Sequence, residues 1–276
     1  MAITNFIPTI WSENLMTALD KKYIAVANCS RDYEGEIKNK GSVVKICGVG
    51  AITVSDYTKN SDMSAPQAIS DTVTELTIDK AKFFNFQIDD VDRAQCSPKL
   101  MDAAMHSAAA GIADEADKYV YSLYEDAGTK ISHADASDGK LIESIIKARQ
   151  KLYENNVTDS ASVVLEVSPA VASVILKEKL AITNSADAFE NGYIGSIAGC
   201  KIYVSNNIKQ EAASGSSSHK CIMRTKRAIA FAEQLSEIDA YRPEKRFADA
   251  VKGLHLYGAK VVYPTEMVTL EISVKA

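Results

Sequence analysis

The sequence predicts an α+β fold, and three observations lead to this prediction. A long amphipathic helix is expected from Pro98 to Ala127, because Ser97 can cap its start and Gly128 can end it. Apolar and polar residues alternate before this helix and through much of the C-terminal part, as they do in β-strands. Between these parts, from about residue 138 to 208, helical and strand-like segments follow one another.

The first 35 residues do not resemble the start of a compact domain. Ser12 can cap a short helix, but Phe6, Trp11 and Leu15 need a surface that covers them. A polar, turn-rich stretch follows. We therefore expect this arm to lie on a neighbouring subunit.

A long two-stranded excursion is expected next. Residues 43–47 and 51–54 are strand-like, a polar tract follows from 55 to 71, and residues 75–79 and 84–89 alternate again. An isolated pair of strands is only marginally stable, so this excursion also needs a partner.

The long helix should bury one stripe of side chains. Its members recur three or four residues apart and are Leu100, Ala104, Ala108, Ile112, Ala116, Tyr119 and Leu123. The small residues 108–111 should allow another backbone to approach closely.

The remainder alternates helices and strands. A helix from about 138 to 155 should bury Leu141, Ile145, Ala148 and Leu152, and residues 162–167 should form a strand. Ser168 and Pro169 start another helix. Residues 211–220, rich in serine, suggest a flexible loop, and the stretch from 228 to 272 returns to strands.

Three glycines, Gly192, Gly195 and Gly199, allow two interpretations. A phosphate-binding loop needs the order G-x-G-x-x-G before a helix, whereas here residues 200–205 alternate as a strand. A hairpin with Gly199 in its turn is the simpler interpretation. Residues 48–53 fail the same test for a phosphate loop.

Composition and charge restrict the class of protein. Hydrophobic residues make up 46% and charged residues 24%, as in folded soluble proteins, and the net charge is −5. This balance gives no general attraction to nucleic acid, and the basic run 223–227 is interpreted as a solvated strand end. Five cysteines without C-x-x-C spacing favour a reducing compartment. No signal peptide or membrane-spanning run is present in the sequence.

Candidate reactive residues are few. The histidines do not form a helical metal-binding pair, and His219 and His255 are expected in a loop and on the outer face of a strand; the four are His106, His133, His219 and His255. Asp89, Asp90 and Asp92 could bind a divalent cation, but acids at a strand-to-helix boundary are more often structural. We expect no catalytic, cofactor-binding or metal-binding residue, and no cofactor.

The order of these parts, together with particular stretches, resembles the major capsid proteins of tailed bacteriophages. The stretches are residues 32–46, 56–60, 76–92, 191–207 and 225–264. The resemblance implies an N-terminal arm at 1–35, an E-loop at 36–80, a P-domain at 81–139 and 241–276 with a spine helix at 98–127, and an A-domain at 140–240.

The resemblance also implies function and partners. It implies a non-enzymatic protein of the virion capsid, assembled in the bacterial cytoplasm, whose hexameric and pentameric capsomers enclose double-stranded DNA without sequence-specific binding or membrane contact. Because the sequence begins at Met1 almost directly with the arm, we expect a separate scaffolding protein, unless the sequence is a mature form, and also a portal. Lys59 could donate to a crosslink, but no acceptor is evident, so we expect none.

Two other interpretations remain at this stage. A nanocompartment of the encapsulin type shares the fold but encloses cargo enzymes. An α/β enzyme is the alternative from another class, and it needs a pocket with converging polar groups.

Overall fold

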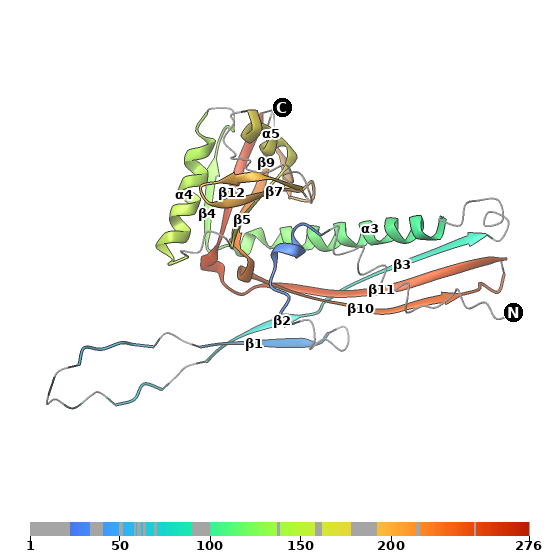
Figure 1. The fold of residues 1–276 in the computed structure, drawn as a ribbon, viewed down its shortest axis with the longest axis horizontal. Helices are drawn as coiled ribbons and strands as arrows, with labels where there is room; N and C mark the ends of the chain where they lie inside the picture. Colours follow the sequence, from blue (N-terminus) through green and yellow to red (C-terminus); the bar gives the residue numbers. More distant parts are fainter. Residues whose placement is uncertain are drawn as a thin grey trace.

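The computed structural model of the 276-residue chain places two layered parts against each other, with a thin ribbon extending from them (Figure 1). The structure describes residues 23–33, 41–49, 52–57, 59, 62, 65–68, 71–89, 100–136, 139–157, 162–177, 192–213, 216–245 and 247–275.

The first part is a three-stranded antiparallel sheet covered by a long helix. Its strand order is β10 (Ile229–Tyr241), β11 (Ala248–Val261), β3 (Lys80–Asp89). Helix α3 (Leu100–Ser122) runs along β11 and β3 (Figure 1). It continues as a 3-10 turn, η3 (Leu123–Asp126), so the helical stretch ends close to the predicted residue. The predicted start at Pro98 lies outside the described residues.

The buried stripe of α3 is displaced by about one residue from the prediction. Ile112 and Ala116 are buried as expected, whereas Ala104, Ala108 and Tyr119 are only partly covered. The buried apolar set consists of Met105, Ala109, Ile112, Ala113, Ala116, Val120 and Tyr121. Two adjacent rows of alanines are equally apolar, so the pattern could not distinguish them.

Among the described residues, the close backbone approach predicted at 108–111 is not found at Gly111. A Cβ added at Gly111 would meet no atom within 4 Å. The close approach occurs instead at Gly128, which follows the helix. Its N–H donates to the carbonyl of Pro264 at 2.9 Å, and a Cβ there would lie 2.6 Å from the same oxygen.

The second part is a seven-stranded mixed sheet flanked by α4 (Leu141–Glu154) and α5 (Pro169–Lys177). The strand order is β4-β12-β9-β5-β7-β6, and β8 pairs with β9 beside β5. The bounds are β4 Thr129–His133, β5 Val163–Val167, β6 Tyr193–Ile197, β7 Cys200–Val204, β8 Gln210–Ala213, β9 Ser216–Thr225 and β12 Met267–Lys275. Three short 3-10 turns are η1 Val26–Asn28, η5 Lys226–Ala228 and η6 Pro264–Glu266.

Local predictions in this part are largely confirmed. The predicted face of α4 (Leu141, Ile145, Ala148 and Leu152) is buried in the core beneath the sheet. Ser168 caps α5, because its Oγ accepts a hydrogen bond from the Val171 N–H at 3.4 Å. The glycine-rich segment is a hairpin of β6 and β7, as predicted, with Ala198 and Gly199 at φ 48° and 77° in its turn.

The flexible loop predicted at 211–220 is instead mostly strand. β8 ends at Ala213 and β9 begins at Ser216, and β12 pairs with β9 from Ser216 onward. Serine-rich composition favours loops, but a long neighbouring strand offers backbone partners that composition does not reveal.

The ribbon consists of β1 (Val43–Val49) and β2 (Asp71–Thr77), paired antiparallel. Its base packs on the face of the three-stranded sheet opposite α3, in a cluster of Val44, Ile46, Leu76, Ile78, Ala230, Ala232 and Leu256. Ile52–Val54, predicted as strand, form none, because the two limbs diverge beyond the paired residues. The ribbon and its loop project away from the far ends of β3, β10 and β11 (Figure 1).

Residues 23–33 belong to the core of their own chain. Tyr23, Ala25, Val26 and Cys29 are buried, and Ser30 forms a parallel bridge to Ala230. The prediction that residues 1–35 form an arm covered by a neighbouring subunit is therefore wrong for residues 23–33, because their own chain buries them. The expected short helix after Ser12 lies outside the described residues.

Candidate assembly surfaces and the buried junction

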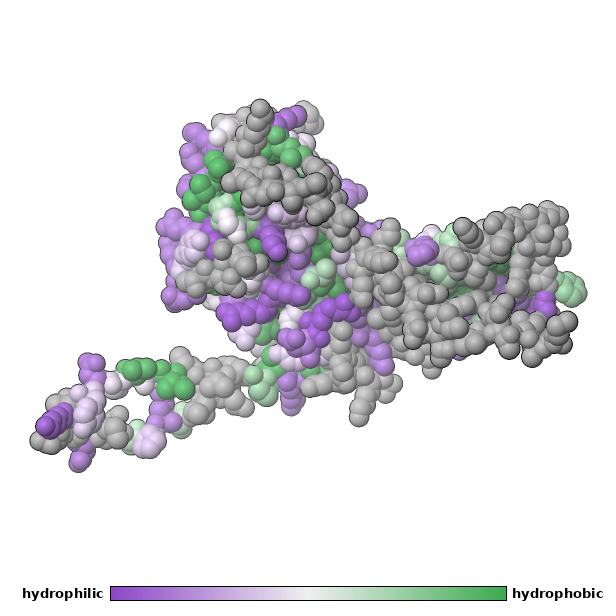
Figure 2. Space-filling view, in the orientation of Figure 1, coloured by the Kyte–Doolittle hydropathy of each residue, from purple (hydrophilic) through white to green (hydrophobic). Residues whose placement is uncertain are grey.

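The loop at the end of the ribbon, here called the extended loop (described residues 52–57, 59, 62 and 65–68), exposes apolar side chains. The exposed fractions are 66% for Ile52, 92% for Val54 and 74% for Tyr57. The Thr53 N–H donates to Gln67 Oε1 at 2.9 Å, which links the two limbs. Figure 2 shows hydrophobic residues gathered on one limb of this thin loop. Such exposure is unfavourable in water and indicates a surface that becomes covered.

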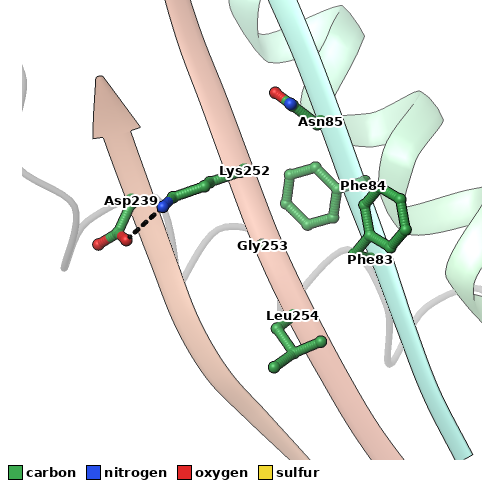
Figure 3. Close-up of a pocket in the computed structure, with 7 residues that line it drawn as sticks. All are labelled: Phe83, Phe84, Asn85, Asp239, Lys252, Gly253 and Leu254. Atoms are coloured by element: carbon green, nitrogen blue, oxygen red, sulfur yellow. Dashed lines mark ion pairs between the residues drawn. The ribbon is translucent and has the colours of Figure 1, made fainter.

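A second exposed surface lies on the sheet face opposite α3, beyond the base of the ribbon. Phe83 of β3 is 78% exposed, and Leu254 of β11 is exposed beside it. Together with an ion pair between Lys252 and Asp239 at 3.2 Å, they line a groove of about 270 Å³ (Figure 3). This sheet-face groove continues the apolar face that the ribbon base covers further along β11.

The two layered parts meet at a junction that sequence reasoning missed. Segment 23–33 lies there and contacts three buried charged groups from different elements. The first is Asp117 of α3, whose carboxylate accepts hydrogen bonds from the N–H groups of Ile24, Ala25 and Val26 at 3.0, 3.1 and 3.1 Å. Burial raises the pKa of Asp117 to about 7 despite these hydrogen bonds.

The second group is a buried ion pair between Arg224 of β9 and Glu166 of β5. The guanidinium also donates to the carbonyls of Asn28 at 2.6 Å and Ala25 at 2.9 Å. Asn28 Nδ2 donates to Glu166 Oε1 at 3.2 Å. Arg224 lies in the basic run that the sequence analysis interpreted as a solvated strand end. That interpretation is wrong for this residue, because its side chain is fully buried.

The third group is Glu233 of β10. Its carboxylate accepts hydrogen bonds from Tyr23 Oη at 2.5 Å and Arg31 Nη2 at 2.5 Å, and His255 Nε2 lies 2.9 Å away. Burial tends to raise the pKa of Glu233, but the contacts with His255, Tyr23 and Arg31 outweigh it and hold the pKa below its usual value. His255 was expected on the outer face of its strand, and it is instead fully buried.

The structure does not bring the other candidate residues together. His133 lies 2.9 Å from Ser144, His219 lies 2.9 Å from Ser217, and His106 is exposed. His219 is buried in β9 rather than exposed in a loop, because β9 is longer than predicted. Asp89 is exposed at the end of β3, while Asp90 and Asp92 lie outside the described residues.

No cluster of three or more potential ligands among His, Cys, Asp and Glu side chains is found in the part of the chain that the structure describes. Four cysteines are described and all are free: Cys47 is exposed, whereas Cys29, Cys200 and Cys221 are buried. Within the same residues, no helix combines the length and apolarity needed to cross a membrane.

Comparison with known proteins shows which solved structures share this architecture. A solved chain from Mycobacterium phage Che8 is 30% identical, with a TM-score of 0.68 and 90% of each chain covered. The capsid of Ralstonia phage GP4 matches with a TM-score of 0.66 at 12% identity, covering 94% of this chain and 90% of the other. A virus-like particle from Pyrococcus furiosus matches at 0.57 and 12% identity, covering 94% and 96%. No protein-family model and no curated protein matches the chain.

The fold, a long helix over an elongated sheet with a projecting ribbon, is that of proteins that build closed shells. The similarity to the Che8 chain over nine-tenths of both sequences shows the family: the chain belongs to the major capsid proteins of tailed bacteriophages. It is a structural, non-enzymatic component of the virion capsid that forms homo-oligomeric capsomers of an icosahedral head. The Pyrococcus particle, at 12% identity, shares the fold alone.

Proposed function

We propose that the chain builds hexameric and pentameric capsomers in which the extended loop of one subunit packs on the next. The observation that carries this proposal is the exposure of Ile52, Val54 and Tyr57 on a loop that projects away from its own subunit (Figure 1). Covering apolar surface contributes about 25 cal/mol per Å². A contact that is repeated around a ring therefore accumulates a large stabilisation from small areas.

The sheet-face groove beside Phe83 is the surface that we propose receives the extended loop. The loop and the far end of the sheet point in opposite directions, so a loop can reach this groove only on another subunit (Figure 1). The groove is partly apolar and flanked by the Lys252–Asp239 ion pair, which gives a polar rim. Such a head-to-tail contact forms a closed ring when the rotation from each subunit to the next adds up to a full turn.

Domain assignments follow as part of the proposal. The E-loop, at 36–80, includes the ribbon, and the P-domain, at 81–139 and 241–276, includes α3 and β11. The A-domain, at 140–240, includes α4, α5 and most of the mixed sheet. Strand pairing supports moving β10 into the P-domain, and β4 and β12 into the A-domain.

Partners beyond the subunit itself are also proposed. A separate scaffolding protein and a portal take part in assembly in the bacterial cytoplasm, and the finished shell encloses double-stranded DNA. The net charge of −5 supports retention by confinement rather than by affinity. Nucleic acid inside purified particles would distinguish this head from a compartment that encloses enzymes.

The test is a charge placed on the extended loop. In Val54→Asp the subunit should stay folded, with the circular dichroism of the wild type, but particles should be lost in electron micrographs. Asp56→Ser on the same loop is the matched control and should assemble, because Asp56 is exposed and already polar. Normal particles from Val54→Asp would overturn the role given to this loop.

A further inference from the structure

Helix α4 carries an arginine that is buried with its hydrogen-bond donors unsatisfied. Arg149 is 2% exposed. Its Nε, Nη1 and Nη2 atoms are buried, and none of them has a hydrogen-bond partner in the part of the chain that the structure describes. A guanidinium keeps its positive charge in proteins, so burying it without acceptors is costly. Three buried donors on one cation therefore point to a ligand that accepts hydrogen bonds.

Arg224, which is also fully buried, shows how this fold satisfies such a charge. Its guanidinium makes two hydrogen bonds to the carboxylate of Glu166 and donates to two backbone carbonyls. The guanidinium fork matches the oxygens of a carboxylate or phosphate group, which accept two parallel N–H bonds. The comparison indicates that the ligand of Arg149 is an oxyanion.

The described neighbours of Arg149 do not supply this anion. The guanidinium lies over the ring of Tyr153, with Cζ 4.2 Å from the ring centroid, and a ring attracts the charge without satisfying the donors in the guanidinium plane. Burial raises the pKa of Cys200 to about 11 although Arg149 lowers it, so this thiol is neutral near pH 7. Glu154, at the end of α4, is exposed and accepts a hydrogen bond from Lys151 at 2.6 Å.

We propose that Arg149 anchors a site for a small oxyanion, which the guanidinium binds through two parallel hydrogen bonds. Tyr153 is 49% exposed and lies against the guanidinium, so turning this one side chain opens a route from solvent. The inference does not rest on the contact proposed for the extended loop, because the site belongs to α4 and the mixed sheet.

The same chemistry has two sources, a free anion such as inorganic phosphate and an acidic side chain of a neighbouring subunit. The second source is considered because Ile146, three residues before Arg149 on α4, is 50% exposed. Together with Tyr153 it gives Arg149 an apolar rim that a neighbouring subunit could cover.

Thermal unfolding of the full-length, unassembled chain tests binding, with inorganic phosphate replacing chloride at constant ionic strength. At a phosphate concentration of ten times its Kd, the ratio of folded to unfolded wild type should rise about elevenfold. Arg149→Met should still fold, because it breaks no ion pair, and it should keep only the general stabilisation that phosphate gives to proteins. Lys147→Met, which removes an exposed lysine of the same helix, is the matched control and should respond as the wild type does.

Electron micrographs of particles assembled in phosphate-free buffer distinguish the two sources. A phosphate response that only Arg149→Met loses assigns a free oxyanion to the site. An equal phosphate response in wild type and Arg149→Met, together with particles that are lost in Arg149→Met but not in Lys147→Met, assigns a carboxylate of a neighbouring subunit. An equal response together with equal assembly would overturn the site.

Discussion

Arg224 and Glu166 face each other across β9 and β5 in a two-point ion pair with no exposure of either side chain. Nε lies 3.0 Å from Oε2 and Nη2 lies 3.1 Å from Oε1. The guanidinium also donates to two carbonyls of segment 23–33, so its charge is well compensated. The pair therefore ties the mixed sheet to the segment that lies between the two layered parts.

Removing one member of this pair should strongly destabilise the subunit. Arg224→Ala leaves the Glu166 carboxylate buried without its cation, which costs about 3–5 kcal/mol in similar cases. Urea unfolding followed by circular dichroism measures the change. The control is Lys118→Ala, which removes an exposed pair with Glu115 and should cost less than about 1 kcal/mol. Equal losses in the two variants would contradict the structural role of Arg224.

Two glycines should respond in opposite directions to alanine. At Gly258 a Cβ would lie 2.4 Å from the Thr77 carbonyl oxygen, where the ribbon crosses β11, so Gly258→Ala should destabilise the base of the ribbon by about 1–3 kcal/mol. At Gly111, in an exposed helix position with open space, alanine should stabilise by about 0.5–1 kcal/mol. Thermal melts of both variants test the pair, and a stabilised Gly258→Ala would show that the crossing is looser than described.

Glu233→Gln should reveal the pH range in which the buried carboxylate of Glu233 stabilises the folded subunit. Its pKa is held below the usual 4.5, so its stabilisation is present above that value and is lost as the pH falls through the lower, folded-state pKa. The difference in unfolding free energy between wild type and variant should be about 2–3 kcal/mol near pH 6 and shrink below pH 4.5. Glu244→Gln, an exposed control, should show no such change. A difference that grows on acidification would reverse the assigned sign.

Thiol reactivity should separate the described cysteines. Cys47 is exposed and should react rapidly with a disulfide reagent in the native protein. Burial raises the pKa of Cys29 and Cys200 to about 11 and that of Cys221 to about 12, so these thiols should react only on opening or unfolding. Mass spectrometry of labelled peptides identifies the modified residue. Rapid labelling of Cys221 would be incompatible with its buried position in β9.

Local patterns predicted local structure well. Helix α4 and the β6–β7 hairpin follow from side-chain period and from one glycine with positive φ, both of which act over a few residues. The interpretation as a capsid protein came from the order of such parts along nearly the whole chain. By contrast, which of two alanine rows on α3 is buried depends on the sheet beneath it.

The junction could not be predicted because its partners lie far apart in the chain. Glu166 and Arg224 are 58 positions apart, and each resembles a surface residue in its own strand. His255 was misassigned for a related reason. Strand β11 is covered on one face by α3 and on the other, along part of its length, by the ribbon base, so alternation along it does not mark exposure.

The position of β12 determines when the mixed sheet can be completed during synthesis. β12 lies between β4 and β9, although it follows both of them in the chain. Until the ribosome has released residues 267–275, the facing edges of β4 and β9 have no partner, and unpaired edges invite association with other chains. A nascent subunit therefore passes through a period of open edges that ends only when a late strand is inserted, and chaperones that bind such edges would act within that period.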